Sequence, residues 1–294
     1  MTPICSLILA GMLTAAPADA RSDGAAAPPD EATARDTPGA SAAPAAAETQ
    51  GVSPAPPVSA APSAPDVPDV PALLARVDAE WKRRDEPGRL DEIRSLLGEA
   101  EKAAPRDYGV LWRTARLYFW MSDDPALPDD EKSRLGKEAW EYGDRATEVD
   151  PGRVEGWYFA AVGMGNYSLG IGILKALAQG IESKFRDRLS RAEKIDPGYL
   201  QGGVYNAWGR FYFKLPWPKY DARKSEQALR KAIRVNPANV RGRVYLAELY
   251  IKEGHPKEAR KLLEEALARA PGVYDAPEER RSQQQAREML AGLK

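Results

Sequence analysis

One short motif recurs along this chain and constrains its fold more than any other feature: an alanine followed five residues later by a proline. Because proline cannot continue a helix, each pair predicts the end of one helix and a turn into the next. Successive prolines stand 46, 46, 40 and 34 residues apart, and a unit repeated at such intervals is typical of a helical solenoid. The five pairs are Ala100 with Pro105, Ala146 with Pro151, Ala192 with Pro197, Ala232 with Pro237, and Ala266 with Pro271.

The last interval has the length of a tetratricopeptide repeat, about 34 residues. Small residues let the two helices of such a unit approach, and large residues fill the remaining gaps. The sequence therefore predicts an all-α, tetratricopeptide-like solenoid of about five helical hairpins, ended by a polar capping helix over residues 277–292. The residues that match the repeat's small, aromatic, large and proline positions are Ala247, Tyr250, Ala259, Leu263, Ala266 and Pro271.

The longer intervals require inserts of about 6 to 12 residues between the two helices of a unit. One insert covers residues 122–130, and another covers residues 214–221, where two prolines flank Trp217. The third insert, residues 167–180, is apolar and rich in glycine, and the pattern leaves open whether it forms a helix or a loop.

The aromatic residues divide the chain. All 24 Phe, Tyr and Trp residues follow Glu80, so the first quarter cannot build a core. Residues 1–20 resemble a signal peptide, with an apolar run at 4–16 and a small-x-small cleavage site ending at Ala20. Residues 21–70, rich in Ala and Pro, predict a disordered tether, and residues 71–294 predict the repeat domain.

The single cysteine and the charge balance limit the chemistry. Cys5 lies inside the apolar run, so a chain cleaved after Ala20 has no thiol for a disulfide or a metal. The surroundings of Cys5 do not form a lipoprotein box, so we expect an exported protein of the periplasm or cell envelope without an evident lipid anchor. The net charge of -1 argues against nucleic acid or an anionic membrane as the bulk partner.

Aromatic residues gather on the first helices of the hairpins, which line the concave face in solenoids of this kind. Of the 24 aromatic residues, 17 lie at residues 108–120, 157–167, 199–213 and 245–250. Because groove and core positions interleave at helical spacing, these rings either line a binding groove or fill the core between repeats. The residues that alignment of the units places in the groove are Trp112, Arg116, Phe119, Trp157, Met164, Tyr167, Asn206, Arg210 and Phe213.

Two arginines, Arg116 and Arg210, fall at the same repeat position. Their guanidinium groups suit a carboxylate on a ligand or partner. The alternative for each arginine is an ion pair with an acidic residue of a neighbouring helix.

No motif points to catalysis, a metal or a cofactor. The glycines between Gly163 and Gly172 do not form a dinucleotide site, because no strand precedes them. Asn166 and Lys175 interrupt the apolar run that surrounds these glycines, which disfavours a membrane span. The only histidine, His255, precedes a proline in a tight turn, so no imidazole pair is available for a metal. A hydrolase built on two carboxylates is the least supported alternative.

One string of residues resembles a known family. It reads Gly202-Gly203-x-Tyr205-x-x-x-Gly209-Arg210-x-Tyr212-x-x-Leu215-Pro216, and Ala192-x-x-x-Asp196-Pro197 precedes it. Over residues 90–272 the sequence resembles the TatT family, periplasmic tetratricopeptide-repeat components associated with TRAP transporters. The helical pattern also resembles the eukaryotic regulator-of-microtubule-dynamics proteins, although an exported chain with an Ala/Pro tether suits them less well.

The TatT resemblance implies a homotrimer, a hydrophobic cavity in each protomer and docking to the transporter's solute-binding protein. It implies no catalytic residues, and it places Tyr205, Arg210 and Tyr212 around the cavity, with residues 157–177. We therefore expect a non-catalytic binding protein for a small apolar or carboxylate ligand, or for a periplasmic protein. A structural adaptor for assembly of the cell envelope is the alternative.

Overall fold

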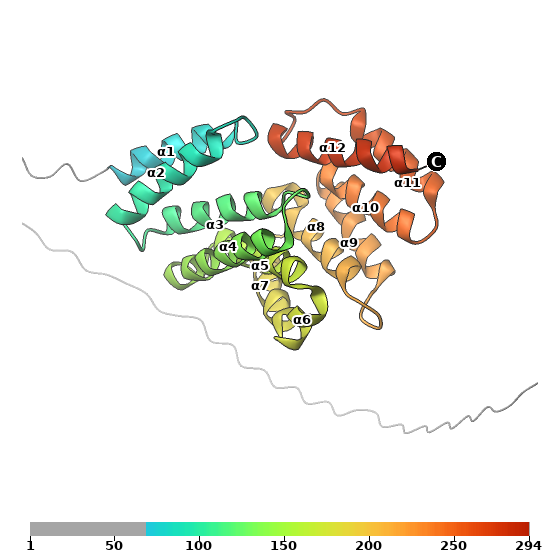
Figure 1. Cartoon of the computed structure of the whole chain (residues 1–294), viewed down its shortest axis with the longest axis horizontal. Coiled ribbons are helices and arrows are strands. Elements are labelled where there is room, and N and C mark those ends of the chain that lie inside the picture. Colours follow the sequence, from blue (N-terminus) through green and yellow to red (C-terminus); the bar gives the residue numbers. More distant parts are fainter. Residues whose placement is uncertain (1–68, 294) are drawn as a thin grey trace, which may run out of the picture. The chain divides into compact units, whose positions relative to one another are not determined.

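The computed structural model describes residues 69–293, and these residues form twelve helices and no strand (Figure 1). The helices follow one another as antiparallel pairs, which confirms the expected all-α solenoid of tetratricopeptide type. The helices are α1 (Val70–Trp81), α2 (Arg89–Ala103), α3 (Tyr108–Ser122), α4 (Asp129–Val149), α5 (Val154–Ile171), α6 (Ile173–Ala178), α7 (Ile181–Ile195), α8 (Tyr199–Lys214), α9 (Ala222–Val235), α10 (Val240–Lys252), α11 (Pro256–Leu267) and α12 (Ala276–Gly292).

The alanines of the repeated motif hold the ends of the second helices. All five are fully buried, with 0 % of their surface exposed. In four units the carbonyl of the alanine also accepts the last helical hydrogen bond, from the capping residue four positions later, as from Asp150 to Ala146 at 3.0 Å. The alanine is thus small because it faces the partner helix, and the proline follows because the helix has ended.

Helices α4 and α5 approach more closely than any side chain would allow. A Cβ atom on Gly143 of α4 would lie 2.5 Å from the backbone nitrogen of Ala160, and one on Gly163 of α5 would lie 2.6 Å from the nitrogen of Trp140. Gly136 and Gly170 make similar approaches further along the same two helices. Gly163 and Gly170, which belong to the glycine-rich segment that forms no dinucleotide site, therefore serve helix packing.

The three inserts lie where the spacing predicts. Residues 123–128 connect α3 to α4, and residues 215–221 connect α8 to α9. The segment 167–180, left open by the sequence, is mostly helical: α5 continues to Ile171, Gly172 breaks it at a φ of 89°, and α6 follows.

The last helix does more than cap the solenoid. It begins at a capping aspartate, Asp275, whose side chain accepts a hydrogen bond from the backbone of Glu278. The same carboxylate accepts two hydrogen bonds of 2.8 Å from Arg84, in the turn that follows α1. Arg280 binds Asp85 beside it at 2.6 and 3.0 Å. The two ends of the repeat array therefore meet, with α12 next to the α1–α2 turn (Figure 1).

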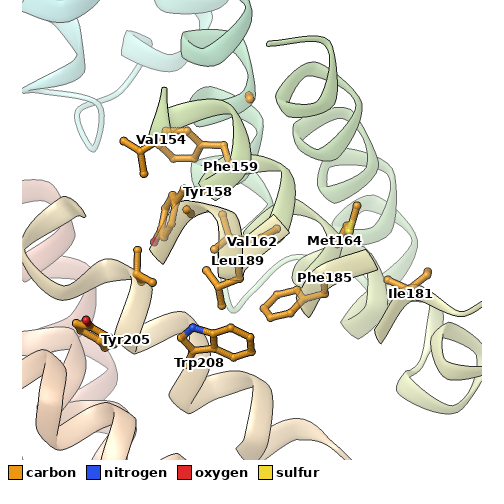
Figure 2. Packing of buried hydrophobic residues seen from close by; sticks show 14 of the residues in the cluster. Val154, Tyr158, Phe159, Val162, Met164, Ile181, Phe185, Leu189, Tyr205 and Trp208 are labelled. Carbon is orange, nitrogen blue, oxygen red and sulfur yellow. The ribbon is translucent and has the colours of Figure 1, made fainter. Parts of the chain in front are cut away.

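The largest core cluster lies in the middle units. Side chains of α5, α7 and α8 meet there, among them Phe159, Leu189 and Trp208 (Figure 2). Within the described residues, none of the helices has the length and apolar character needed to cross a membrane. The predicted signal peptide at 1–20 and nearly all of the predicted tether at 21–70 lie outside the described residues.

Candidate functional site

A cavity of about 410 Å³ lies between the first helices of the hairpins and the closing helix α12. Its volume falls within the range of roughly 300–1,000 Å³ that is typical of small-molecule sites. Helices α1, α3, α5 to α8, α10 and α12 all contribute to its wall. Apolar side chains from α5 to α8 and the residue after α8 make up one side: Phe159, Val162, Leu169, Ile173, Leu177, Ile181, Phe185, Phe211 and Leu215.

The rings of the apolar side pack on one another and leave part of their surface to the cavity. Phe185 and Phe211 stack with their centroids 4.8 Å apart and their planes 6° from parallel. Tyr158 meets Phe159 edge-on at 5.2 Å, and Tyr199 meets Tyr158 at the same distance. Such packing fixes the rings, so the wall needs little rearrangement to receive an apolar molecule.

A left-handed turn at the start of α8 places two of the lining residues. Leu200 and Gln201 have a φ of 49°, and Gly202 follows at 98°. The left-handed region is costly for residues with a side chain, so the surrounding packing must hold this turn. A Cβ on Gly202 would lie 2.9 Å from the carbonyl oxygen of Ala232, which explains the glycine. The turn directs Tyr199 and Leu200 to the cavity wall.

On the side of α1 and α3, tryptophans and arginines alternate in one continuous stack, hereafter the Arg–Trp stack. Arg84 lies between the rings of Trp81 and Trp120, at 4.4 and 4.0 Å from their centroids. Arg116 lies between Trp81 and Trp112, at 4.1 and 4.7 Å. Arg113 on Trp112 and Arg281 on Trp120 complete the stack, at 4.3 and 3.4 Å. Arg281 belongs to α12, so the stack also joins the two ends of the array.

Near α12 the wall is polar. Arg241 of α10 lies 2.8 Å from Asp123 and 2.7 Å from Glu278, so one guanidinium faces two carboxylates. Burial raises the pKa of Glu278, and the charge of Arg241 offsets only part of this effect. Burial likewise raises the pKa of Tyr158 and Tyr274 far above the usual value, so both hydroxyls keep their protons.

Further along the wall, on α8 and α10, positive charge is in excess. Arg210 and Lys214, one turn apart on α8, both bind the single carboxylate of Glu248. Burial, and then the charge of Arg210, lower the pKa of Lys214, and the charge of Lys252 adds to this effect. Two cations thus share one acid beside the apolar wall, which suits a further negative group.

Five of the eleven residues expected from the sequence lie on the cavity wall: Trp112, Arg116, Phe119, Asn206 and Arg210. Their helical positions are those that the unit alignment indicates. Both arginines nevertheless have acidic partners, because Asp78 binds Arg116 at 2.9 Å and Glu248 binds Arg210. Each arginine therefore forms an ion pair with an acidic residue of a neighbouring helix, which was the alternative interpretation.

The other six lie elsewhere. Met164 is fully buried in the core, and Phe213 belongs with Leu229 of α9 to a core cluster that α10 completes. Tyr205 is buried under Lys231, whose nitrogen lies 4.0 Å from its centroid. The remaining three rings contact other residues away from the cavity: Trp157 is covered by Arg191, Tyr167 meets Trp140 edge-on, and Tyr212 stacks on Trp208. Helical spacing alone did not separate these core positions from the wall.

Several residues of the cavity wall are not among those predicted from the sequence. Tyr199 and Leu200 carried a signal, the adjacent glycines at 202 and 203. Phe185 lies on α7, a second helix, and was therefore not expected at the concave face. No sequence pattern indicates that Glu278 lies on the cavity wall. Its position depends on contacts between segments about 190 residues apart in sequence, such as the one between Arg84 and Asp275.

Family models match two parts of the chain. The model for regulator of microtubule dynamics proteins 1–3 matches residues 73–217, just under half of the sequence. A tetratricopeptide-repeat model matches residues 220–278. Neither is a model of the TatT family, so that resemblance stays a prediction. Among curated proteins, none matches the sequence.

Two solved structures illustrate what the fold resembles. A thermophilic repeat protein from Thermus thermophilus has a TM-score of 0.57 at 21% identity, and the match covers 76% of this chain and 99% of that one. PilF of Pseudomonas aeruginosa has a TM-score of 0.47 at 15% identity, with 76% and 91% covered. The first of these matches and the repeat model define the fold as a helical solenoid of the tetratricopeptide type. Such a fold presents an extended concave surface that can bind a partner.

Proposed function

We propose that this chain is an exported, non-catalytic binding protein that holds a small apolar or carboxylate ligand in its aromatic cavity. In this proposal it acts in the periplasm as an accessory to a TRAP-type solute transporter and binds the transporter's solute-binding protein. The cavity of about 410 Å³ is the observation that carries the proposal.

The wall favours a ligand with an apolar body. Its rings are fixed by mutual stacking, and Arg84, Arg113 and Arg116 of the Arg–Trp stack already bind acids of the protein. A carboxylate on the ligand has one favourable place, beside Arg210 and Lys214, where the protein supplies a single acid. A cation–carboxylate contact in such a partly buried place is stronger than in water.

Export and the transporter partner rest on the sequence. The apolar run and cleavage site near Ala20 favour export, and the Gly-Arg-x-Tyr-x-x-Leu-Pro string that begins at Gly209 supports the TatT resemblance. The same resemblance favours a homotrimer.

A cavity-filling variant tests the ligand. Gly165 lines the cavity, and an added Cβ would meet only Phe185, at an ordinary 3.6 Å. Gly165→Leu should therefore place its Cβ without a clash and occupy part of the cavity, and the helix should gain up to about 1 kcal/mol from losing a glycine. Gly98→Leu is the matched control, because Gly98 has no neighbouring atom within 4 Å of an added Cβ and does not line the cavity.

The measurement is native mass spectrometry of protein from cell envelopes, which also reports the oligomeric state. We expect a bound small molecule in the wild type and in the Gly98→Leu control, and at least about a tenfold loss in Gly165→Leu. Crosslinking of protein tagged after the C-terminal residue should recover a solute-binding protein attached near Lys175 or Lys214. An empty cavity in all three proteins would contradict the ligand, and absence of the solute-binding protein would contradict the transporter.

The alternative is a structural adaptor for assembly of the cell envelope. The tetratricopeptide-repeat match at residues 220–278 favours a protein partner in general. Recovery of envelope-assembly proteins alone, together with an empty cavity, would support this second function.

A further inference from the structure

Two of the three inserts meet at one edge of the repeat domain. Lys219, between α8 and α9, forms an ion pair with Glu182 in the first turn of α7, which directly follows α6. Phe185 of α7 stacks on Phe211 of α8 close to this pair. We call residues 172–186 and 214–224 together the insert edge.

The insert edge exposes two large apolar side chains. Trp217 is 88% exposed and Leu174 is 74% exposed, which makes them the most exposed large apolar residues of the described chain. A standard repeat contains neither segment. Single exposed apolar residues are ordinary on a protein surface, but two that stand on linked inserts require a closer look at their surroundings.

The surroundings are strongly basic. Although the whole chain has a net charge of -1, basic residues outnumber acidic ones on the insert edge. Both acids there are already paired, Glu182 with Lys219 and Asp221 with Lys224. The basic residues are Lys175, Lys184, Arg186, Lys214, Lys219, Arg223 and Lys224, and the acidic residues are Glu182 and Asp221. Of these basic residues, Lys214 lies in the cavity wall and binds Glu248 of α10.

The same segments also form part of the cavity wall. Ile173 and Leu177 of α6 line the cavity, while Leu174 between them is exposed. Lys214 and Leu215 line it from α8 and the following residue, shortly before Trp217. A surface that covers the exposed residues of the insert edge would therefore lie next to the cavity.

We propose that the insert edge docks the protein on an anionic phospholipid bilayer. Tryptophan and leucine next to lysines are the residues that anchor peripheral proteins at the interface between headgroups and acyl chains. Each lysine or arginine near such a surface adds attraction to anionic lipids. An apolar ligand dissolves in a bilayer, so docking here also brings the cavity to a source of such ligands. This inference goes beyond the proposed function, which needs no membrane contact. Because Lys175 and Lys214 both belong to the insert edge, the bilayer and the solute-binding protein would compete for this surface.

Vesicle co-sedimentation of the full purified chain tests the proposal. The vesicles are phosphatidylcholine alone and phosphatidylcholine mixed with phosphatidylglycerol, at low and high salt. We expect binding to the mixed vesicles, weakened by salt. Trp217→Ala with Leu174→Ser should weaken binding on the order of thirtyfold. Lys175→Gln with Arg186→Gln should weaken it by a similar factor, on the order of thirtyfold.

Matched controls lie away from the insert edge. Val273→Ser removes another exposed apolar residue, 69% exposed, from the turn before α12. Lys257→Gln with Lys261→Gln removes two exposed lysines from α11. Both controls should bind as the wild type does. The proposal is overturned if the wild type ignores the mixed vesicles, or if control and test variants lose the same affinity. It is also overturned if the Trp217 and Leu174 changes abolish capture of an acidic protein while vesicle binding stays intact.

Discussion

Two sides of the cavity use aromatic rings differently. On the side of α1, α3 and α12, guanidinium groups cover the faces of Trp81, Trp112 and Trp120. On the side of α5 to α8, Phe185 and Phe211 stack on each other and line the cavity. In the first arrangement the protein's own guanidinium groups cover the ring faces, whereas the second leaves apolar ring surface for another molecule.

The comparison shows that ring count alone does not define a binding surface. A tryptophan between two arginines contributes to stability, and each such contact is worth about 0.5–2 kcal/mol depending on desolvation. A ring that borders empty space contributes less to stability, because it lacks partner atoms on one side. The two sides should therefore respond differently to substitution.

The largest expected effect separates the two sides directly. Trp120 is 2% exposed and contacts Arg84 and Arg281, so Trp120→Ala should lower the free energy of unfolding by about 3–5 kcal/mol. Phe211→Ala removes a half-buried ring from the cavity wall and should cost about 1–2 kcal/mol. Ligand retention should show the reverse order.

Denaturant unfolding and native mass spectrometry measure these two quantities on the same samples. Trp157→Ala is a control, since Trp157 lies outside the cavity and the Arg–Trp stack. Equal loss of stability in the Trp120 and Phe211 variants would contradict the claim that the two sides of the cavity contribute differently to stability.

The next effect concerns the contact between the two ends. Arg84 is 2% exposed and is the partner of Asp275, so Arg84→Met leaves that carboxylate without its cation. Removing one partner of a buried pair costs about 3–5 kcal/mol, and about 2–3 kcal/mol is expected here because Asp275 is partly exposed.

Hydrogen exchange should locate this loss in α1 and α12 first. Arg83→Met is the matched control, because Arg83 is exposed and binds only Glu86 of its own turn. If exchange in α12 stays unchanged in Arg84→Met, the contact between Arg84 and Asp275 does not hold the ends together.

The smallest effect is a pH dependence at the polar wall. Burial raises the pKa of Glu278 above its ordinary 4.5, so the folded chain binds this proton more tightly than the unfolded chain. Its contribution to stability is therefore present at low pH and is lost as pH rises above 4.5 through the folded pKa. Glu278→Gln should flatten this loss.

Glu248 provides the opposite case. Burial raises its pKa, but the charges of Arg210 and Lys214 outweigh burial and lower it overall. Its contribution is lost as pH falls below 4.5, so Glu248→Gln should alter only the acid side. Unfolding midpoints measured across pH in both variants distinguish the two. A Glu278 variant that follows the wild type above pH 4.5 would show that this carboxyl has an ordinary environment.

The local parts of the fold were predictable from the sequence. Ala146 and Pro151 mark a helix end through local effects. The small side chain of Ala146 allows close packing in the last turn, and Pro151 lacks the N–H that a continuing helix needs. Trp112 and Phe119 were placed on the wall for the same reason, since helical spacing fixes a face. Met164 and Phe213 were misplaced because the core and the cavity lie on adjacent faces of one helix, and no local pattern tells them apart.

The rest of the site depends on contacts distant in sequence. Glu278 reaches the wall only because α12 packs beside the first hairpin, which the repeat pattern does not encode. The sequence alone does not show whether Arg116 is free to bind a ligand. In the structure Asp78 of α1 lies 2.9 Å from its guanidinium group and binds it. The left-handed turn at Leu200 and Gln201 likewise follows from tertiary packing, since both residues disfavour that conformation on their own.

The contact between α12 and the α1–α2 turn changes how such a repeat array should unfold. In an open solenoid each repeat contacts only its neighbours, so end units fray and stability adds up unit by unit. Here the first and last units hold each other through Arg84, Asp275, Asp85 and Arg280. Neither end is then free to fray, and the hairpins should unfold as a single cooperative transition rather than from the termini inward.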